Sequence, residues 1–130
     1  MEDELAAVPF AGVLGIEIVA AAPEEVRGSM RWTPQLCTVA GVLHGGALMS
    51  FADTLGAVCA FLHLPDETTT TTVESKTNFF RAVRGGRVIG VTRPLHAGRR
   101  FIVVQTDLFD DEERPVAQTT QTQAVLTPER

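Results

Sequence analysis

Two features of this sequence combine residue types that can carry out chemistry. The first is the run His44-Gly45-Gly46, which directly precedes a long apolar stretch. Glycines at a helix start let a ligand approach the backbone, and the N–H groups of the first turn are unpaired donors at the positive end of the helix dipole. This arrangement suits a developing oxyanion or a thioester carbonyl. The alternative interpretation is a tight turn into a helix, with His44 hydrogen-bonded locally.

The second feature is Asp53, the only charged residue between His44 and His63. A carboxylate inside an apolar helix costs free energy unless it is paired or protonated, and such a cost is typical of a general base or a nucleophile. The alternative is a structural carboxylate bonded to a neighbouring hydroxyl, Ser50 or Thr54. The same residue argues against a membrane span, because a bilayer penalises a charge at its centre.

Asp53 and Gly45 cannot both contact one substrate atom within a single chain. They are eight residues apart, which is about 12 Å along a helix. If both act on one carbonyl, antiparallel helices of two subunits must face each other. We therefore expect a homodimer with two active sites on its two-fold axis.

Charge is unevenly distributed along the chain. Residues 81–100 contain six arginines and no acid, whereas the remainder has five basic and 16 acidic residues, and the total is −5. An acidic total argues against a general nucleic-acid binder, and a local arginine cluster favours a phosphorylated small molecule. The alternative is that these arginines protect edge strands and turns from aggregation. The spacing of these six arginines does not indicate which of them would bind a phosphate.

The 130 residues allow one domain, residues 1–130, with one core. The acidic start, Met1-Glu2-Asp3-Glu4, is unlike a signal peptide, so we expect a cytoplasmic protein whose thiols, Cys37 and Cys59, are reduced. Neither thiol lies in a metal-binding or catalytic pattern, and His63 and His96 lack partner patterns. We therefore expect no metal and no cofactor.

Periodicity and turn residues predict the order of elements. We expect a short helix over 2–10, strands over 13–22 and 25–32, a loop over 33–43 and a helix from His44 to His63. Four strands follow, over 68–81, 87–96, 100–110 and 114–126, and the short connections between them predict antiparallel neighbours. A helix that is apolar on nearly every face must be wrapped by a curved sheet or covered by a partner subunit. The fold class is α+β.

The stretch from Gly41 to Asp53, GVLHGGALMSFAD, resembles the His-Gly-Gly…Asp signature of hotdog-fold acyl-CoA thioesterases, and the phenylacetate-pathway (PaaI-like) type above all. The strand over 72–82, TVESKTNFFRA, is also similar to that family. The likeness extends over about residues 13–126. It implies a curved antiparallel sheet around one central helix, and dimers that often pair into homotetramers.

The resemblance also implies roles for individual residues. Gly45 would polarise the thioester carbonyl through its N–H, and Asp53 of the opposing subunit would be the nucleophile or general base. Thr72 would position water or the carboxylate, and His44 would stabilise the turn and contact the thioester. Substrate binding is expected at Gly46, Arg81, Arg99 and Arg100. Many relatives have Asn six residues before the histidine, where this chain has Thr38.

The leading hypothesis is hydrolysis of an acyl-CoA to free acid and CoA, with no nucleic-acid or membrane partner. The main alternative is a non-catalytic acyl-CoA-binding sensor of the same fold, which would bind CoA without turnover. An acyl-CoA hydratase is a further alternative, although its usual active-site helix motif differs from this one. Neither the acyl group nor the choice between nucleophile and general base can be derived from the residues.

Overall fold

One six-stranded antiparallel sheet and one long helix make up most of this protein, for which the computed structural model describes residues 5–128. The sheet order is β1-β2-β4-β5-β6-β3. In chain order the helices and strands are α2 (Pro9–Leu14), β1 (Ile16–Ala22), β2 (Glu25–Arg31), the 3-10 turns η1 (Pro34–Leu36) and η2 (Val39–Gly41), α3 (Gly45–Phe61), β3 (Thr69–Phe79), β4 (Arg87–Ala97), β5 (Phe101–Phe109) and β6 (Pro115–Leu126).

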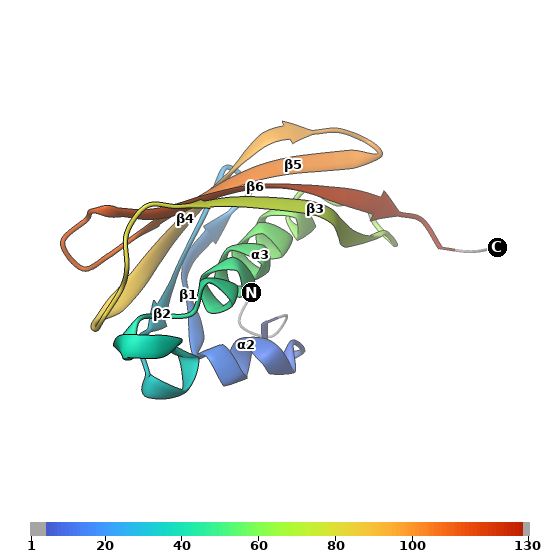
Figure 1. The fold of residues 1–130 in the computed structure, drawn as a ribbon. Coiled ribbons are helices and arrows are strands. Elements are labelled where there is room, and N and C mark those ends of the chain that lie inside the picture. The colour runs from blue at the N-terminus through green and yellow to red at the C-terminus, as the bar shows by residue number, and fades with distance from the viewer. Residues whose placement is uncertain (1–4, 129–130) are drawn as a thin grey trace.

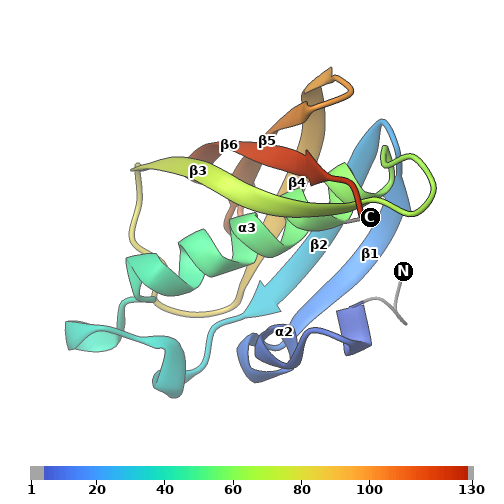
Figure 2. The same cartoon turned by 90° about the vertical axis from the view of Figure 1, so that its right-hand side faces the viewer.

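Helix α3 lies against the concave face of the sheet, which curves around it (Figures 1 and 2). Phe51 and Leu55 of α3 are completely buried, and Ile102, Val104 and Leu108 of β5 meet them from the sheet. Close approach of helix and sheet requires a small residue on β4, because a Cβ at Gly90 would overlap the Leu55 side chain. The predicted curved sheet around one apolar helix is confirmed, and this is the hotdog architecture.

One predicted connection is wrong. The strands predicted over 68–81 and 87–96 were expected to be neighbours joined by a short connection, but β3 pairs with β6 and β4 pairs with β2 and β5. Segment 80–86 therefore crosses between non-adjacent strands. As a result β3 forms one edge of the sheet, with only one strand hydrogen-bonded to it. The β4–β5 and β5–β6 connections are hairpins, as predicted.

The N-terminal elements also differ from the prediction. The helix expected over 2–10 falls partly outside the described residues; Leu5 and Ala6 are helical, and α2 then begins at Pro9. Residues 13–15, predicted as strand, instead end this helix. Gly15 terminates it with a left-handed backbone (φ 72°), a conformation that glycine adopts without steric cost.

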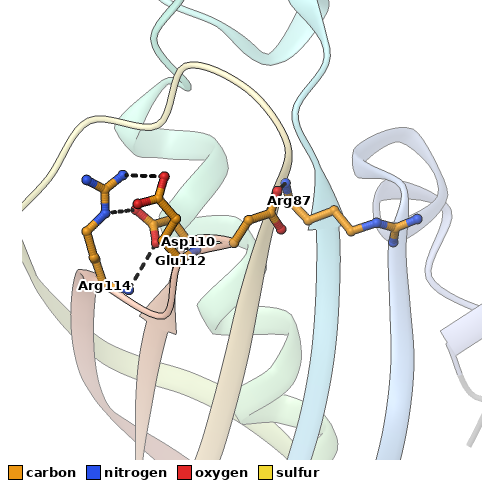
Figure 3. A network of polar contacts seen from close by, with 5 residues as sticks. Arg87, Asp110, Glu112 and Arg114 are labelled. Carbon is orange, nitrogen blue, oxygen red and sulfur yellow. Dashed lines mark hydrogen bonds and ion pairs between the residues drawn. The ribbon is translucent and has the colours of Figure 1, made fainter.

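The β5–β6 turn is closed by a network of polar contacts (Figure 3). Asp110 Oδ1 accepts from the N–H groups of Arg114 and Glu112, both at 2.9 Å, and Oδ2 accepts from Arg114 Nε at 2.8 Å. These bonds, led by the Arg114 N–H, hold the pKa of Asp110 below its ordinary value. The turn fixes where β6 begins and hence which side chains of β6 face α3.

None of the helices described between residues 5 and 128 is long and apolar enough to cross a membrane.

Candidate active site

Asp53 lies in the middle of α3 and faces the sheet at β3 and β6. Its Oδ1 accepts two hydrogen bonds, from Thr72 Oγ1 of β3 and from Gln121 Nε2 of β6, each 2.8 Å long. Within residues 5–128 no hydrogen bond reaches Oδ2. The carboxylate is therefore held by one oxygen, and the other remains available to a ligand.

The alternative partners suggested by the sequence are not used. Ser50 Oγ donates to Gly46 O at 2.7 Å, and Thr54 Oγ1 donates to Ser50 O at 2.8 Å. Both hydroxyls thus bond to carbonyls one turn earlier in their own helix, as serine and threonine often do in helix interiors. The interpretation of Asp53 as a carboxylate bonded to Ser50 or Thr54 is wrong.

An apolar groove of about 430 Å³ adjoins Asp53. Its walls come from α3, from the start of β3 and from the segment before α2, and Asp53 is the only charged residue among the described ones that line it. The remaining lining residues are Leu5, Ala7, Val8, Thr54, Ala57, Val58, Phe61, Thr69 and Thr70. The volume is in the range of small-molecule sites, and the lining suits an uncharged apolar group next to the carboxylate.

The start of α3 is arranged around His44. Its Nδ1 accepts from the Gly46 N–H at 2.7 Å, and its backbone oxygen accepts from the N–H groups of Ala47 and Leu48. Among the described residues this leaves the Gly45 N–H as the first-turn donor without an acceptor. An Nδ1 that accepts carries no proton, so neutral His44 holds its hydrogen on Nε2 of an exposed ring.

Phe79, the last residue of β3, closes one side of this helix start. A Cβ at residue 45 would lie 3.2 Å from the Phe79 ring, so glycine lets the ring approach the backbone. A second hollow, of about 230 Å³, lies beside His44 and Gly46 and is lined also by Cys37 and Phe10. The free Gly45 N–H and a hollow lined by its neighbours His44 and Gly46 therefore lie at the same end of α3.

Within one chain the two predicted catalytic groups are not brought together. Gly45 begins α3, and Asp53 follows eight residues later in the same continuous helix, about 12 Å along its axis. Thr72, by contrast, lies directly against Asp53.

The predicted phosphate-binding arginines lie at opposite ends of the sheet. The Arg81 N–H donates to Val116 O at the start of β6, and Arg100 O accepts from Val125 N–H near its end. Nine residues of extended strand separate these two points by about 30 Å. The segment after β3, which includes Arg81, lies at the end of the sheet where α3 begins, whereas the β4–β5 turn, which includes Arg99 and Arg100, lies at the other end (Figure 1).

Two other arginines of the 81–100 window are paired. Arg93 contacts Glu25 at 2.7 Å, and Arg87 lies 3.8 Å from Glu17. Within residues 5–128, no three His, Cys, Asp or Glu side chains are grouped so that they could hold a metal ion. Thr38, at the position where relatives often have Asn, is exposed next to the η2 turn.

The sequence analysis missed Gln121 and Gln123. Both are buried on β6 and face α3, and Gln123 Nε2 donates to Thr72 Oγ1 at 2.7 Å. Polar residues on both faces of β6 gave no alternation that distinguishes its buried face. A usable signal was the two-residue spacing of Gln121 and Gln123, which puts them on one face.

Comparison with known proteins gives a consistent result. The family model described as Thioesterase superfamily matches residues 40–117. The proofreading thioesterase EntH of Cronobacter turicensis is 32% identical over 101 residues, covering 78% of this chain and 74% of that protein. The 1,4-dihydroxy-2-naphthoyl-CoA hydrolase of Escherichia coli is 38% identical over 86 residues, covering 66% and 63%. The crystal structure of a thioesterase from Haemophilus influenzae superposes with a TM-score of 0.91 at 28% identity, covering 97% and 88%.

Proposed function

Since this chain belongs to the thioesterase superfamily, we propose that it hydrolyses the thioester bond of an acyl-CoA to give the free acid and CoA. The observation that carries the proposal is the Asp53 carboxylate, anchored through Oδ1 by Thr72 and Gln121 while Oδ2 is free beside an apolar groove. Relatives named as thioesterase and as CoA-thioester hydrolase support the reaction class.

Asp53 Oδ2 has one of two roles in this mechanism. As a nucleophile it attacks the thioester carbonyl carbon itself, and as a general base it takes a proton from the water that attacks this carbon. The carbonyl oxygen becomes negative and accepts a hydrogen bond from the Gly45 N–H at the positive end of α3. His44 Nε2–H is a second donor at the same place. The C–S bond then breaks and the CoA thiolate leaves. If Asp53 acts as a base, the proton that it took from water passes to the thiolate, and the free acid is already formed. If Asp53 acts as a nucleophile, the acyl group is left on its carboxylate as an anhydride, which a water molecule hydrolyses to release the free acid and supply the proton for the thiolate.

The acyl group occupies the apolar groove next to Asp53. No cation lines that groove among the described residues, so the acyl group it accepts carries no negative charge at its far end. Its length and ring content are to be determined by assay across aryl-, short-, medium- and long-chain acyl-CoAs.

Because Gly45 and Asp53 are separated along α3, the proposed mechanism calls for a homodimer in which each site takes Gly45 from one protomer and Asp53 from the other. Support comes from β3, an eleven-residue edge strand with one free side and with Val73 57% exposed. Long exposed edges tend to pair with another chain. Antiparallel pairing of two such edges brings Arg81 of one protomer to the same end as Arg99 and Arg100 of the other. Arg81 of one protomer can then bind the phosphates of the same CoA as Arg99 and Arg100 of the other protomer.

This homodimer is expected to assemble further into a homotetramer. Light scattering after size-exclusion chromatography measures the assembly, and a monomer that remains fully active would contradict the shared site.

Asp53→Asn tests the catalytic role. It keeps the size of the side chain and removes its charge, so kcat for acyl-CoA hydrolysis should fall about 10²–10⁴-fold. Release of CoA thiol measures the rate. Asp107→Asn is the matched control, because Asp107 also accepts a glutamine amide, from Gln118 at 2.9 Å, but on the opposite face of the sheet. Undiminished hydrolysis by Asp53→Asn would refute the role, and tight CoA binding without any turnover by the wild type would favour the sensor instead.

A further inference from the structure

Gln121, which donates a hydrogen bond to Asp53 from the sheet, is an unusual residue for a core position. Gln121 is completely buried on β6, and its Nε2 donates to Asp53 Oδ1 at 2.8 Å. Its Oε1 is also buried and has no hydrogen-bond partner among the described residues. A buried amide with an unpaired oxygen is destabilising, and a methionine of similar length would fill the same space without that penalty. Packing alone therefore does not explain a glutamine here.

Next to the buried Gln121 amide lies a second unfavourable feature, a glycine inside helix α3. Gly56 lies in the interior of α3, three residues after Asp53, and glycine is a poor residue for a helix interior. A Cβ at residue 56 would overlap the Gln121 amide. The missing side chain of Gly56 is therefore what lets the amide lie beneath the helix and reach the carboxylate.

Gln123 sets the direction of the other bond to Asp53. Thr70 Oγ1 donates to Gln123 Oε1 at 3.0 Å, and Gln123 Nε2 donates to Thr72 Oγ1 at 2.7 Å. Because an ionised carboxylate only accepts, the single hydroxyl hydrogen of Thr72 goes to Asp53 Oδ1. Both donors to Oδ1 are thus fixed by buried groups of β6.

We propose that Gln121, seated in the space left by Gly56, is a positioning residue that fixes the Asp53 carboxylate so that Oδ2 faces the substrate. Gln123 positions the same carboxylate indirectly, because it orients the Thr72 hydroxyl that donates to Asp53 Oδ1. The inference rests on the proposed function of Asp53. A carboxylate locked at one oxygen keeps the other within the narrow range of positions from which it can react, and displacement by about 1 Å can cost 10²-fold in rate.

Gln121→Met is the first test. It removes the amide but fills the same volume, so kcat should fall about 10–10²-fold while KM changes little, because the groove is unaltered. Gln118→Met is the matched control: Gln118 lies on the same strand and donates to a carboxylate on the opposite face, Asp107. Gln118→Met should hydrolyse acyl-CoA at the wild-type rate. Gln121→Met with wild-type kcat overturns the inference.

Gly56→Ala provides an independent variant if Gln121→Met folds poorly. It leaves every catalytic group in place and displaces only the Gln121 amide, so kcat should fall while the helix itself is favoured by alanine. Wild-type kcat in a Gly56→Ala protein of unchanged fold also overturns the inference.

A double variant separates positioning from a general structural effect. If Gln121 acts through the carboxylate, Gln121→Met should reduce the residual rate of Asp53→Asn by less than about twofold. A full multiplicative loss in that background would show a structural effect and overturn the inference. Failure of the proposed function looks different: Asp53→Asn is then as active as the wild type, and both proposals are lost together.

Discussion

At the scale of single residues, the decisive feature is that Thr72 and Gln121 both donate to the same oxygen of Asp53. If each oxygen of the carboxylate accepted a hydrogen bond from the protein, neither oxygen would be free to react with a substrate. With both donors on Oδ1, the protein fixes the group and leaves Oδ2 for chemistry. The Thr72 hydrogen bond is what orientation of the carboxylate requires, and orientation is one of the two roles that the family resemblance implies for this residue.

Thr72→Val tests this role. Valine matches threonine in shape and suits a strand, but it removes the donor to Oδ1 and leaves Gln123 Nε2 without its acceptor. We expect a loss of about 1–3 kcal/mol in stability from the unpaired buried amide. We also expect kcat to fall about 10²-fold from the released carboxylate. Thr77→Val is the control: Thr77 lies on the same strand as Thr72, and its hydroxyl pairs with that of Thr119 on β6. Its loss should cost stability but leave kcat unchanged.

The two cysteines should differ sharply in reactivity. Cys59 is completely buried on α3, and burial raises the pKa of its thiol to about 11. The neutral form is favoured, so at pH 8 only about one molecule in 10³ carries the reactive thiolate. Iodoacetamide at pH 8 should therefore modify Cys37, which is partly exposed, and not Cys59. Intact-mass spectrometry should show one adduct on the native protein and two in denaturant; two adducts on the native protein would contradict the burial.

At the scale of elements, the long helix and most strands could be predicted because local patterns determine them. The apolar run after His44-Gly45-Gly46 has no other stable outcome in water than a buried helix. The partner of β3 could not be predicted in the same way. The glycines at 85 and 86 are typical of a hairpin turn, but β3 ends at Phe79, and the resulting seven-residue connection 80–86 is longer than most hairpin loops. Strand partners depend on long-range packing, which local turn chemistry does not encode.

The same limit explains which site residues were predictable. Asp53 and Gly45 belong to one helix with an uncommon residue pattern, so the sequence identifies them. Gln121 and Gln123 act only because β6 lies beside β3 and under α3, a contact between segments almost 70 residues apart. Their two-residue spacing puts them on one face of β6, but no local pattern indicates that this face meets α3.

The helix start provides a sharp prediction at this scale. Gly45→Pro removes the N–H proposed to hold the oxyanion and adds a side chain next to Phe79. The backbone itself accommodates the change, because proline is favoured at the first helical position and His44 already has the extended backbone that precedes proline (φ −63°, ψ 136°). We expect kcat to fall about 10²–10³-fold. Gly45→Ala adds the same crowding against Phe79 but keeps the N–H, so it should lose much less. Equal losses in both variants would assign the effect to crowding and not to the donor.

At the scale of the whole molecule, the proposed function makes each chain contribute to two active sites. Residues eight positions apart on one helix cannot reach the same substrate atom, so under this proposal the Gly45 N–H and the Asp53 carboxylate of one chain belong to different sites. Antiparallel pairing of two chains would explain three features together. It would cover the apolar helix, pair the free edge of β3, and bring Arg81 of one chain to the same end as Arg99 and Arg100 of the other. Under the proposed function, a second copy of this small domain completes each site.

Mixing two inactive variants tests this directly. Asp53→Asn protomers lack the carboxylate, and Gly45→Pro protomers lack the N–H, so each homodimer should be nearly inactive. In a heterodimer one site combines the intact Gly45 of one chain with the intact Asp53 of the other, and the second site has both defects. Random reassociation of equal amounts makes half of the dimers mixed, so activity should recover to about 25% of the wild-type rate. The subunits are mixed under mild denaturant, refolded and assayed by thiol release. If instead each site lay within one chain, every site would keep its defect and the mixture would be no more active than its components.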